Sequence, residues 1–279
     1  MGSRISPTAH YTGYVWVRNG LSDPAFETLL GRAMFRAWQP VMALARPALG
    51  GMTLERYLVD RHRMLDRLLE DAIERDGVTQ VLEVAAGLSP RGLTFSERYP
   101  DVVYVEADLE PMVARKRSIL DRAGHHAPNH KIVDVDLLAS DGPDSLEAVT
   151  STELDGERPT AIVAEGLLSY FDSRTLVELW PRLVASLHGF PRGRFLANLE
   201  LGEEAGEWML VRWFLFGLGR AVAAPARLCF IDEAQARSAL KAAGFDQVVL
   251  HAPRDLLGDA RGPLMVRAVE ARVAGTANT

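Results

Sequence analysis

The sequence predicts an α/β fold in which helices cover both faces of an open, mostly parallel sheet of seven strands. Short runs rich in β-branched residues alternate with stretches of helical periodicity through the middle of the chain, which is typical of parallel strands joined by crossover helices. Two further runs near the C-terminus predict an antiparallel last strand. The chain has 279 residues, 48% of them hydrophobic, which is enough apolar material for one sizeable core.

Residues 1–76 are expected to form an N-terminal helical cover. Apolar residues recur at helical spacing between Asp23 and Arg75. Asp23-Pro24 is a capping residue followed by proline at the first helical position, and Thr53 can begin a long helix that ends near Gly77.

Residues 77–201 are expected to form the core of the sheet. The predicted strands are 80–84, 102–105, 131–135, 161–164 and 194–199. The helices predicted between them are 91–98, about 110–123 with Gly124 as its C-cap, and 173–188. This alternation indicates a doubly wound sheet, whose ligands bind beyond the carboxyl ends of the strands.

An apolar insertion at residues 202–230 separates this core from the last elements. It is long and strongly apolar for a connection, and two interpretations stay open: a lid over a bound substrate, or buried core. In residues 231–279, Asp232 begins a helix, with Gln235 completing a capping box and Gly244 closing the helix. The runs 247–250 and 264–269 then complete the core as a strand pair at hairpin-scale separation.

The composition argues against several function classes. A net charge of −6 and scattered basic residues disfavour nucleic-acid binding. The single cysteine, Cys229, cannot form an internal disulfide, which fits a reducing compartment. The N-terminus has no apolar leader and arginines interrupt the most apolar stretch, so a cytoplasmic protein without a membrane span is expected. The histidines lack the spacing of a metal site, and no Gly-x-Ser-x-Gly motif supports a nucleophilic serine.

Polar residues and glycine follow the first two core strands, where a ligand is expected. Small residues around Gly87 let the backbone pass close to a ligand, although an ordinary tight turn explains them equally well. Glu106 lies 19 residues after Gly87, the offset at which an acid can bind both hydroxyls of a ribose. The alternatives are a solvated strand end for Glu106 and a helix N-cap for Asp108.

Acids also follow the third and fourth strands. Asp136 could accept a hydrogen bond from an adenine amino group, with Leu137 flanking the ring, and loop capping is the alternative. Glu165 comes directly after a buried apolar strand, so its charge needs a partner or a ligand. Arg61 lies on a helix with Asp66 at helical spacing, and surface ion pairs would explain that spacing.

These ordered motifs resemble the leucine carboxyl methyltransferase family, which includes bacterial polyketide O-methyltransferases of the tetracenomycin type. The resemblance spans Thr8 to about Leu199. It is carried by Thr8-Ala9 with Arg18, the segment Arg61-His62-Arg63-Met64-Leu65-Asp66, the loop at Gly87, Glu106-Ala107-Asp108 with Lys116, Asp136-Leu137, and Glu165-Gly166-Leu167-Leu168-Ser169-Tyr170.

The resemblance implies a Rossmann-like fold that binds S-adenosyl-L-methionine and releases S-adenosyl-L-homocysteine. It implies that Arg61 pairs with the methionine carboxylate and that Glu165 faces the methionyl amine or the sulfonium. The remaining cofactor residues that it implies are Ala85 and Gly87 in the loop, Asp108 and Glu106 at the ribose, and Asp136 with Leu137 at the adenine.

The loop departs from the family pattern at two positions. Where the family usually has Gly-x-Gly-x-Asp-x-Arg, this chain has Ala85, Gly87, Ser89 and Arg91, so one glycine and the acidic residue are missing. Acids at the strand ends together with Arg61 still suit a cationic, amphoteric sulfonium cofactor better than a dinucleotide with two phosphates.

The expected function is an O-methyltransferase that acts on a carboxylate or hydroxyl of a hydrophobic small molecule in bacterial natural-product metabolism. In-line displacement at the methyl carbon depends mainly on positioning, and a phenol would also need a base. The candidate bases are His10, Tyr14 and Tyr170, and the candidate substrate contacts are Tyr11, Trp208, Trp213 and Phe214. Alternatives are C- or N-methylation of an aromatic metabolite, cofactor binding without methyl transfer, and a nicotinamide-dependent oxidoreductase.

Overall fold

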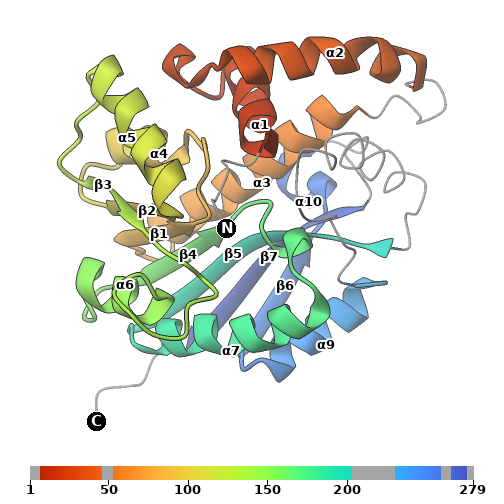
Figure 1. The fold of residues 1–279 in the computed structure, drawn as a ribbon. Helices are drawn as coiled ribbons and strands as arrows, with labels where there is room; N and C mark the ends of the chain where they lie inside the picture. Colours follow the sequence, from red (N-terminus) through yellow and green to blue (C-terminus); the bar gives the residue numbers. More distant parts are fainter. Residues whose placement is uncertain (1–6, 46–52, 203–229, 259–264, 275–279) are drawn as a thin grey trace.

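The computed structural model describes residues 7–45, 53–202, 230–258 and 265–274 (Figure 1). The helices are α1 (Pro7–Arg18), η1 (Pro24–Phe26), α2 (Leu29–Ala45), α3 (Leu54–Glu74), α4 (Arg91–Arg98), α5 (Glu110–Ala123), α6 (Leu146–Glu153), η2 (Leu168–Tyr170), α7 (Ser173–His188), α9 (Glu233–Ala242) and α10 (Pro253–Leu257). The strands are β1 (Gln80–Val84), β2 (Val103–Asp108), β3 (His130–Asp134), β4 (Thr160–Ala164), β5 (Arg192–Glu200), β6 (Gln247–His251) and β7 (Val266–Ala274).

The seven strands form one sheet in the order β3-β2-β1-β4-β5-β7-β6. Strands β1 to β5 run parallel to one another, whereas β7 runs antiparallel to both β5 and β6. The predicted fold class is therefore confirmed. Because strand order reverses beside β1, the carboxyl ends of β1, β2 and β4 define the edge at which this fold binds ligands.

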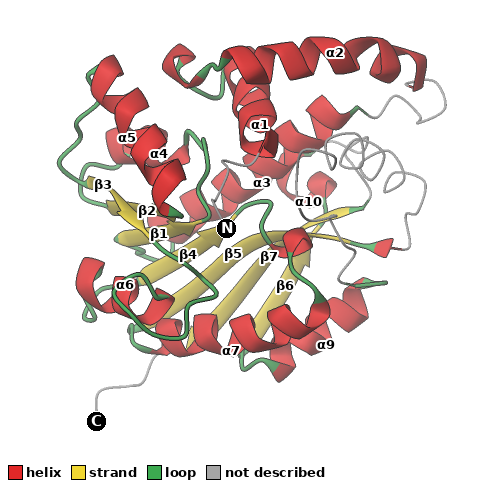
Figure 2. Ribbon diagram, in the orientation of Figure 1, coloured by secondary structure: helices red, strands yellow, loops and turns green. Residues whose placement is uncertain are grey.

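Two layers of helices bury the two faces of the sheet (Figure 2). On one face, alternate strand residues such as Leu82 and Ile162 pack with α6, α7 and α9. On the other face, Val81 and Ala161 pack with α3, whose apolar residues recur at helical spacing and are buried. Adjacent strand residues thus face opposite layers, as the period of two in a pleated sheet requires.

The N-terminal helices lie over the carboxyl edge of the sheet (Figure 1). Helix α1 packs closely enough on the loop after β1 that a Cβ added at Gly13 would lie 3.2 Å from the Cβ of Leu88. Asp23 caps η1, and Thr53 caps α3 by accepting a hydrogen bond from the Arg56 amide, as predicted.

Several boundaries differ from the sequence prediction. Helices α1, α6 and α10 were not individually predicted, and β7 extends to Ala274. The last two strands are not joined by a tight hairpin, since α10 lies between them. The expected capping box is only half formed: Asp232 accepts from the amide of Gln235, whose side chain instead accepts from the amide of Ile231.

Candidate active site at the carboxyl edge of the sheet

The loop after β1 is a tight turn that needs left-handed backbone at two positions. Ala85 has φ of +52° and Gly87 has φ of +53°. An L-residue in this region costs about 1–2 kcal/mol, which glycine avoids. The family pattern has glycine at the position of Ala85, and the positive φ there is the conformational reason for glycine. In this chain the turn forms with alanine at that position.

Asp108, the last residue of β2, holds this loop in place. Its Oδ2 accepts a hydrogen bond of 2.7 Å from the Gly87 amide, and its Oδ1 accepts one of 2.7 Å from the amide of Leu109. Leu109, not Asp108, is the N-cap of α5, so the capping alternative is wrong. Burial raises the pKa of Asp108, which the two amide donors only partly offset. The carboxylate lines a small hollow together with Gly87 and Met112.

Glu106 is buried at the lining of that hollow, and its contacts within the protein are with Lys116, Gly92 and His130. Its Oε1 accepts from the Lys116 Nζ at 2.7 Å and from the Gly92 amide at 3.2 Å. Its Oε2 lies 3.2 Å from the Nε2 of His130. Burial works to raise the pKa of Glu106, but Lys116 and His130 outweigh it, and the pKa lies below its usual value. With 0% of its surface exposed, Glu106 is not a solvated strand end, but its Oε2 has no hydrogen bond among the described residues, so a ribose contact stays a prediction.

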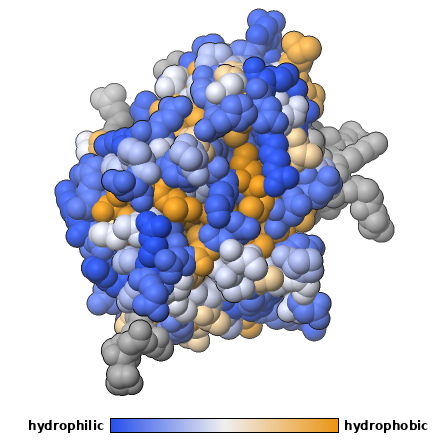
Figure 3. Space-filling view, turned by 90° about the vertical axis from the view of Figure 1, so that its left-hand side faces the viewer, coloured by the Kyte–Doolittle hydropathy of each residue, from blue (hydrophilic) through white to orange (hydrophobic). Residues whose placement is uncertain are grey.

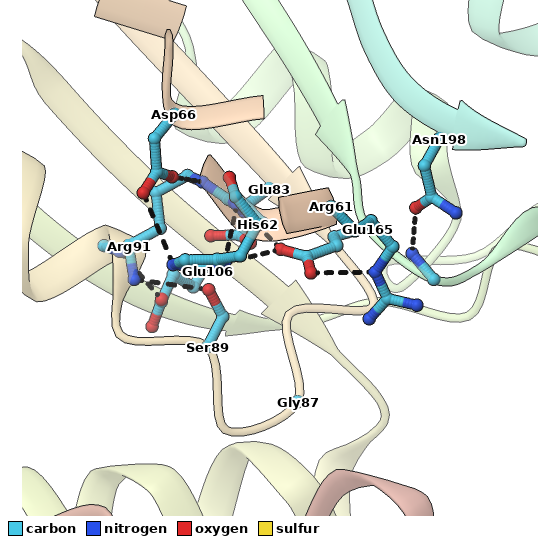
Figure 4. Close-up of polar contacts among 12 residues, drawn as sticks. Arg61, His62, Asp66, Glu83, Gly87, Ser89, Arg91, Glu106, Glu165 and Asn198 are labelled. Atoms are coloured by element: carbon cyan, nitrogen blue, oxygen red, sulfur yellow. Dashed lines mark hydrogen bonds and ion pairs between the residues drawn. The ribbon is translucent and has the colours of Figure 1, made fainter. Parts of the chain in front are cut away.

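Glu165, directly after β4, sits at the centre of a buried charge cluster (Figure 4). Its Oε1 accepts from the Arg61 Nε at 3.0 Å, and its Oε2 lies 2.7 Å from both the Nδ1 of His62 and the Nη2 of Arg91. Burial favours the neutral acid, but these three groups outweigh it and hold the pKa of Glu165 well below its usual value. The expectation that this charge needs a partner is confirmed. Direct contact of Glu165 with the methionyl amine or the sulfonium stays a prediction, and through the Nε of Arg61 the carboxylate also positions that guanidinium.

Arg61 is part of this buried cluster and not of a surface ion pair. The residue is 9% exposed, and its carboxylate partner is 104 positions away in the sequence. The Nη1 and Nη2 atoms lie against Gly166, where an added Cβ would be 3.0 and 3.1 Å away. Gly166 itself is fixed by a 2.6 Å hydrogen bond from its amide to the Oδ1 of Asn198. The turn after β4 therefore makes room for the guanidinium.

Arg91 belongs to the same buried charge cluster, and the predicted site did not include it. It is 1% exposed, and its guanidinium donates to Asp66 at 2.6 Å, Glu83 at 2.5 Å and Glu165 at 2.7 Å. It thereby ties the loop helix α4 to α3, β1 and the turn after β4. Its position in the family motif was the available signal, but sequence spacing could not show which carboxylates surround it.

Asp136 and Leu137 follow β3, as expected, but their contacts are local. The Oδ1 of Asp136 accepts from the Leu138 amide at 2.9 Å, which is the loop-capping alternative. Leu137 is 7% exposed, and its carbonyl accepts from Arg182. Within the described residues, no hydrogen bond or ion pair joins Asp136 or Leu137 to the Gly87 loop, so an adenine site here stays a prediction.

The candidate bases on α1 do not face the loop after β1. His10 Nδ1 lies 3.1 Å from the hydroxyl of Thr28, and Tyr14 packs on Phe35 of α2, so both belong to the α1–α2 contact. Tyr11 is 1% exposed in the core, which leaves no ring surface for a substrate in this structure. These three assignments therefore have no geometric support.

Tyr170 is the predicted base that remains near the site, since it lies five residues after Glu165 in the turn after β4. Its hydroxyl is 2.8 Å from the hydroxyl of Thr8. Trp208, Trp213 and Phe214 lie outside the described residues. In the ranges described, no helix is long and apolar enough to cross a bilayer, and no cluster of His, Cys, Asp or Glu is arranged to hold a metal ion.

Comparison with known sequences identifies the family. The profile of the leucine carboxyl methyltransferase family matches residues 18–183, more than half of the chain. A provisionally named S-adenosyl-L-methionine-dependent methyltransferase of Streptomyces coelicolor is 33% identical over 116 residues, which are 41% of this chain. The match spans only 37% of that relative's own length.

Solved structures share the fold at low sequence identity. A DUF574 family protein from Streptomyces avermitilis has a TM-score of 0.64 at 16% identity, covering 96% of this chain and 99% of that protein. Human N-acetylserotonin methyltransferase in complex with S-adenosylmethionine has a TM-score of 0.51 at 15% identity, covering 96% of this chain and 67% of that protein. The profile match and the shared architecture agree, and the chain belongs to the leucine carboxyl methyltransferase family.

Proposed function

We propose that this protein binds S-adenosyl-L-methionine at the carboxyl edge of its sheet and transfers the methyl group to an oxygen of a hydrophobic small molecule. The acceptor would be a carboxylate or a hydroxyl, in keeping with the family to which the chain belongs. A role in bacterial natural-product metabolism is part of the same proposal and rests on the resemblance of its motifs to polyketide O-methyltransferases.

The observation that carries the proposal is the presentation of Arg61. Glu165 accepts from the Nε of this guanidinium, and Nη1 and Nη2 lie against Gly166, where no side chain intervenes. A planar, permanently charged fork that is held from behind is suited to bind a carboxylate. We assign it to the methionine carboxylate of the cofactor.

The other donors and acceptors at this edge fit the same cofactor. Asp108 presents a carboxylate at the hollow beside Gly87, and a carboxylate can accept hydrogen bonds from ribose hydroxyls. When bound, S-adenosyl-L-methionine supplies a methyl group activated by a sulfonium. The protein's residues would hold the cofactor and orient the acceptor oxygen in line with the methyl carbon, and such positioning supplies much of the rate.

A hydroxyl acceptor also needs a route for its proton. Tyr170 is the base candidate that the fold leaves beside the turn after β4, and its hydroxyl already exchanges a hydrogen bond with Thr8. A carboxylate acceptor is ionised at neutral pH and needs no base. Tyr170→Phe should therefore slow methylation of phenols and leave methylation of carboxylic acids unchanged.

Calorimetric titration with S-adenosyl-L-methionine and S-adenosyl-L-homocysteine tests the binding step. We expect one-to-one binding that Arg61→Met weakens by about tenfold or more, since hydrogen bonds to charged groups are worth about 1.5–3 kcal/mol. Arg63→Met is the matched control, because Arg63 lies on the same helix and is exposed. Absence of binding to the unaltered chain, or equal losses in both variants, would refute the proposal.

Release of S-adenosyl-L-homocysteine with hydrophobic carboxylic acids and phenols tests the transfer step. Methylated product of the expected mass, dependent on Arg61, supports the enzyme. Cofactor binding without product from any acceptor of either class would favour a binding protein with the same fold.

A further inference from the structure

A cavity separate from the proposed cofactor site lies between the start of α2 and the outer face of α5. Its volume is about 280 Å³. It is lined by Ala25, Glu27, Thr28, Leu29, Leu30, Arg115, Ile119 and Arg122. The Gly87 loop, Asp108 and Glu165 are not among these residues, so the cavity is distinct from the site described above.

Two arginines of α5 give this cavity a positive wall. Arg115 and Arg122 are seven positions apart, with Ile119 between them, so all three lie on one face of the helix. The Nε of Arg115 is buried and has no hydrogen-bond partner among the described residues. Arg122 donates only to the neutral hydroxyl of Ser118, at 2.7 Å. Neither guanidinium forms an ion pair within the described part of the chain, in contrast to Arg91.

The negative charge on the opposite wall is already engaged. Glu27 forms an ion pair with Arg32, so it does not neutralise the two arginines of α5. His10, behind the wall, contacts Thr28, and its pKa is lowered by burial and then by the positive charge of Arg115. The cavity lining therefore carries two arginines that form no ion pair with a carboxylate in the described part of the chain.

The beginning of α2 adds donors to the same cavity. Thr28 caps the helix, since its hydroxyl accepts from the Gly31 amide at 3.1 Å. The amides of Leu29 and Leu30 belong to the first turn, where no carbonyl within the helix can accept from them. A helix N-terminus favours an anion, and the guanidinium of Arg115 lines the same cavity.

The rim of the cavity is apolar. Leu29 is 82% exposed and Leu30 is 48% exposed, and Ile119 and Ala25 continue the apolar lining. Figure 3 views the molecule from the side that carries α5 and shows a mostly hydrophilic face crossed by an apolar hollow near its middle. A bare inorganic anion would leave these leucines in water, whereas a ligand with an apolar body would cover them.

We propose that this cavity binds a small amphipathic anion, with its carboxylate or phosphate between Arg115, Arg122 and the first turn of α2 and its apolar chain across Leu29 and Leu30. The cavity is about the size of the smaller ligand pockets in proteins. The bound anion would join the N-terminal cover to the core, since α2 and α5 belong to different parts of the fold.

Calorimetry of the full chain, saturated with S-adenosyl-L-methionine, tests this site with octanoate, octyl phosphate and inorganic phosphate as probes. We expect one-to-one binding of an octyl probe. Whichever of octanoate and octyl phosphate binds more tightly identifies the preferred head group, carboxylate or phosphate. Arg115→Gln and Arg122→Gln should each weaken that probe by about tenfold. Arg174→Gln is the matched control, because its side chain is 90% exposed on α7, and it should change binding less than twofold.

Leu29→Ser separates the apolar contribution from the charge. This substitution should weaken binding of the octyl probe by about threefold and leave binding of inorganic phosphate unchanged, because only the octyl chain of the probe would cover Leu29. Thermal denaturation shows whether each variant is folded. No saturable binding of either octyl probe, equal losses in Arg174→Gln, or inorganic phosphate binding as tightly as octyl phosphate would overturn the proposal. Cofactor affinity, measured in the same variants, should not change, so this site and the proposed function fail independently.

Discussion

Two buried carboxylates at neighbouring strand ends, Glu106 and Glu165, have similar surroundings and different consequences. The side chain of Glu106 is 0% exposed and that of Glu165 is 4% exposed. Cations outweigh the cost of burial at both, so both pKa values lie below the usual value. The partners of Glu106 are Lys116 and His130, whose side chains are buried. The partner Arg61, in contrast, contacts Glu165 through Nε and places Nη1 and Nη2 against the turn at Gly166.

The difference shows that a buried acid at a strand end is not itself a sign of a ligand. An ionised carboxylate inside a protein needs cations or amide donors whatever its function. The informative feature is the position of those donor atoms of the paired cation that do not contact the carboxylate. The partners of Glu106 are buried side chains, whereas the Nη atoms of Arg61 lie at the turn after β4 that we propose as part of the cofactor site. We therefore treat Glu106 as structural and Glu165 as a positioning residue.

The largest expected effect is the loss of the cation that three carboxylates share. Arg91→Met leaves Glu83, Asp66 and Glu165 without it, and we expect the free energy of unfolding to fall by about 3–5 kcal/mol. Urea denaturation measures this change. Arg182→Met is the matched control: it removes a half-exposed ion pair with Glu147 and should cost about 1 kcal/mol or less. Equal losses would show that burial of the Arg91 cluster does not matter.

The direct test of the comparison exchanges each carboxylate for its neutral amide. Glu165→Gln removes the charge that fixes Arg61 and should lower the affinity for S-adenosyl-L-methionine by about tenfold. Glu106→Gln should destabilise the fold but change that affinity by less than about twofold. Calorimetry measures affinity, and denaturation in urea measures stability. If Glu106→Gln weakens the cofactor as much as Glu165→Gln does, Glu106 contacts the ribose after all.

The pH dependence of binding should separate Asp108 from both buried glutamates. Burial raises the pKa of Asp108 above 3.8, so its protonation begins at a higher pH than that of an exposed aspartate. Glu106 and Glu165 have lowered pKa values, so their contribution to stability is complete above 4.5 and is lost only at lower pH. Cofactor affinity should therefore decline with acid while the fold is intact. Asp108→Asn should bind more weakly and lack this decline; a parallel decline in both would contradict the assignment of Asp108.

The smallest expected effect concerns the backbone of the Gly87 loop. Ala85→Gly removes about 1–2 kcal/mol of left-handed backbone strain at φ +52°. Glycine also raises the conformational entropy of the unfolded chain, which costs about 0.5–1 kcal/mol of stability. A net stabilisation of roughly 0.5 kcal/mol should raise the urea midpoint. Ala86→Gly, at the adjacent position without positive φ, should lower it. A lower midpoint in Ala85→Gly would mean that the Cβ makes a contact that outweighs the strain.

The sequence determined the architecture because the relevant signals are local. Strand runs such as 80–84 and caps such as Asp23, Thr53 and Gly124 depend on neighbours within a few residues, and the structure has them where they were expected. The position of Glu165 after a buried strand likewise predicted that its charge would be paired. The helix α1 was harder to foresee, because its faces pack on three different parts of the molecule.

Only the tertiary structure decided which charged residue serves which purpose. Glu106 and Asp108 are two positions apart and both follow the ribose rule, yet one is buried against Lys116 and the other reaches the Gly87 amide. Arg61 and Arg91 meet Glu165 across separations of 104 and 74 residues, which no helical or strand period encodes. Secondary structure is set by interactions along the chain, whereas the ionisation and orientation of a buried group are set by every element packed around it.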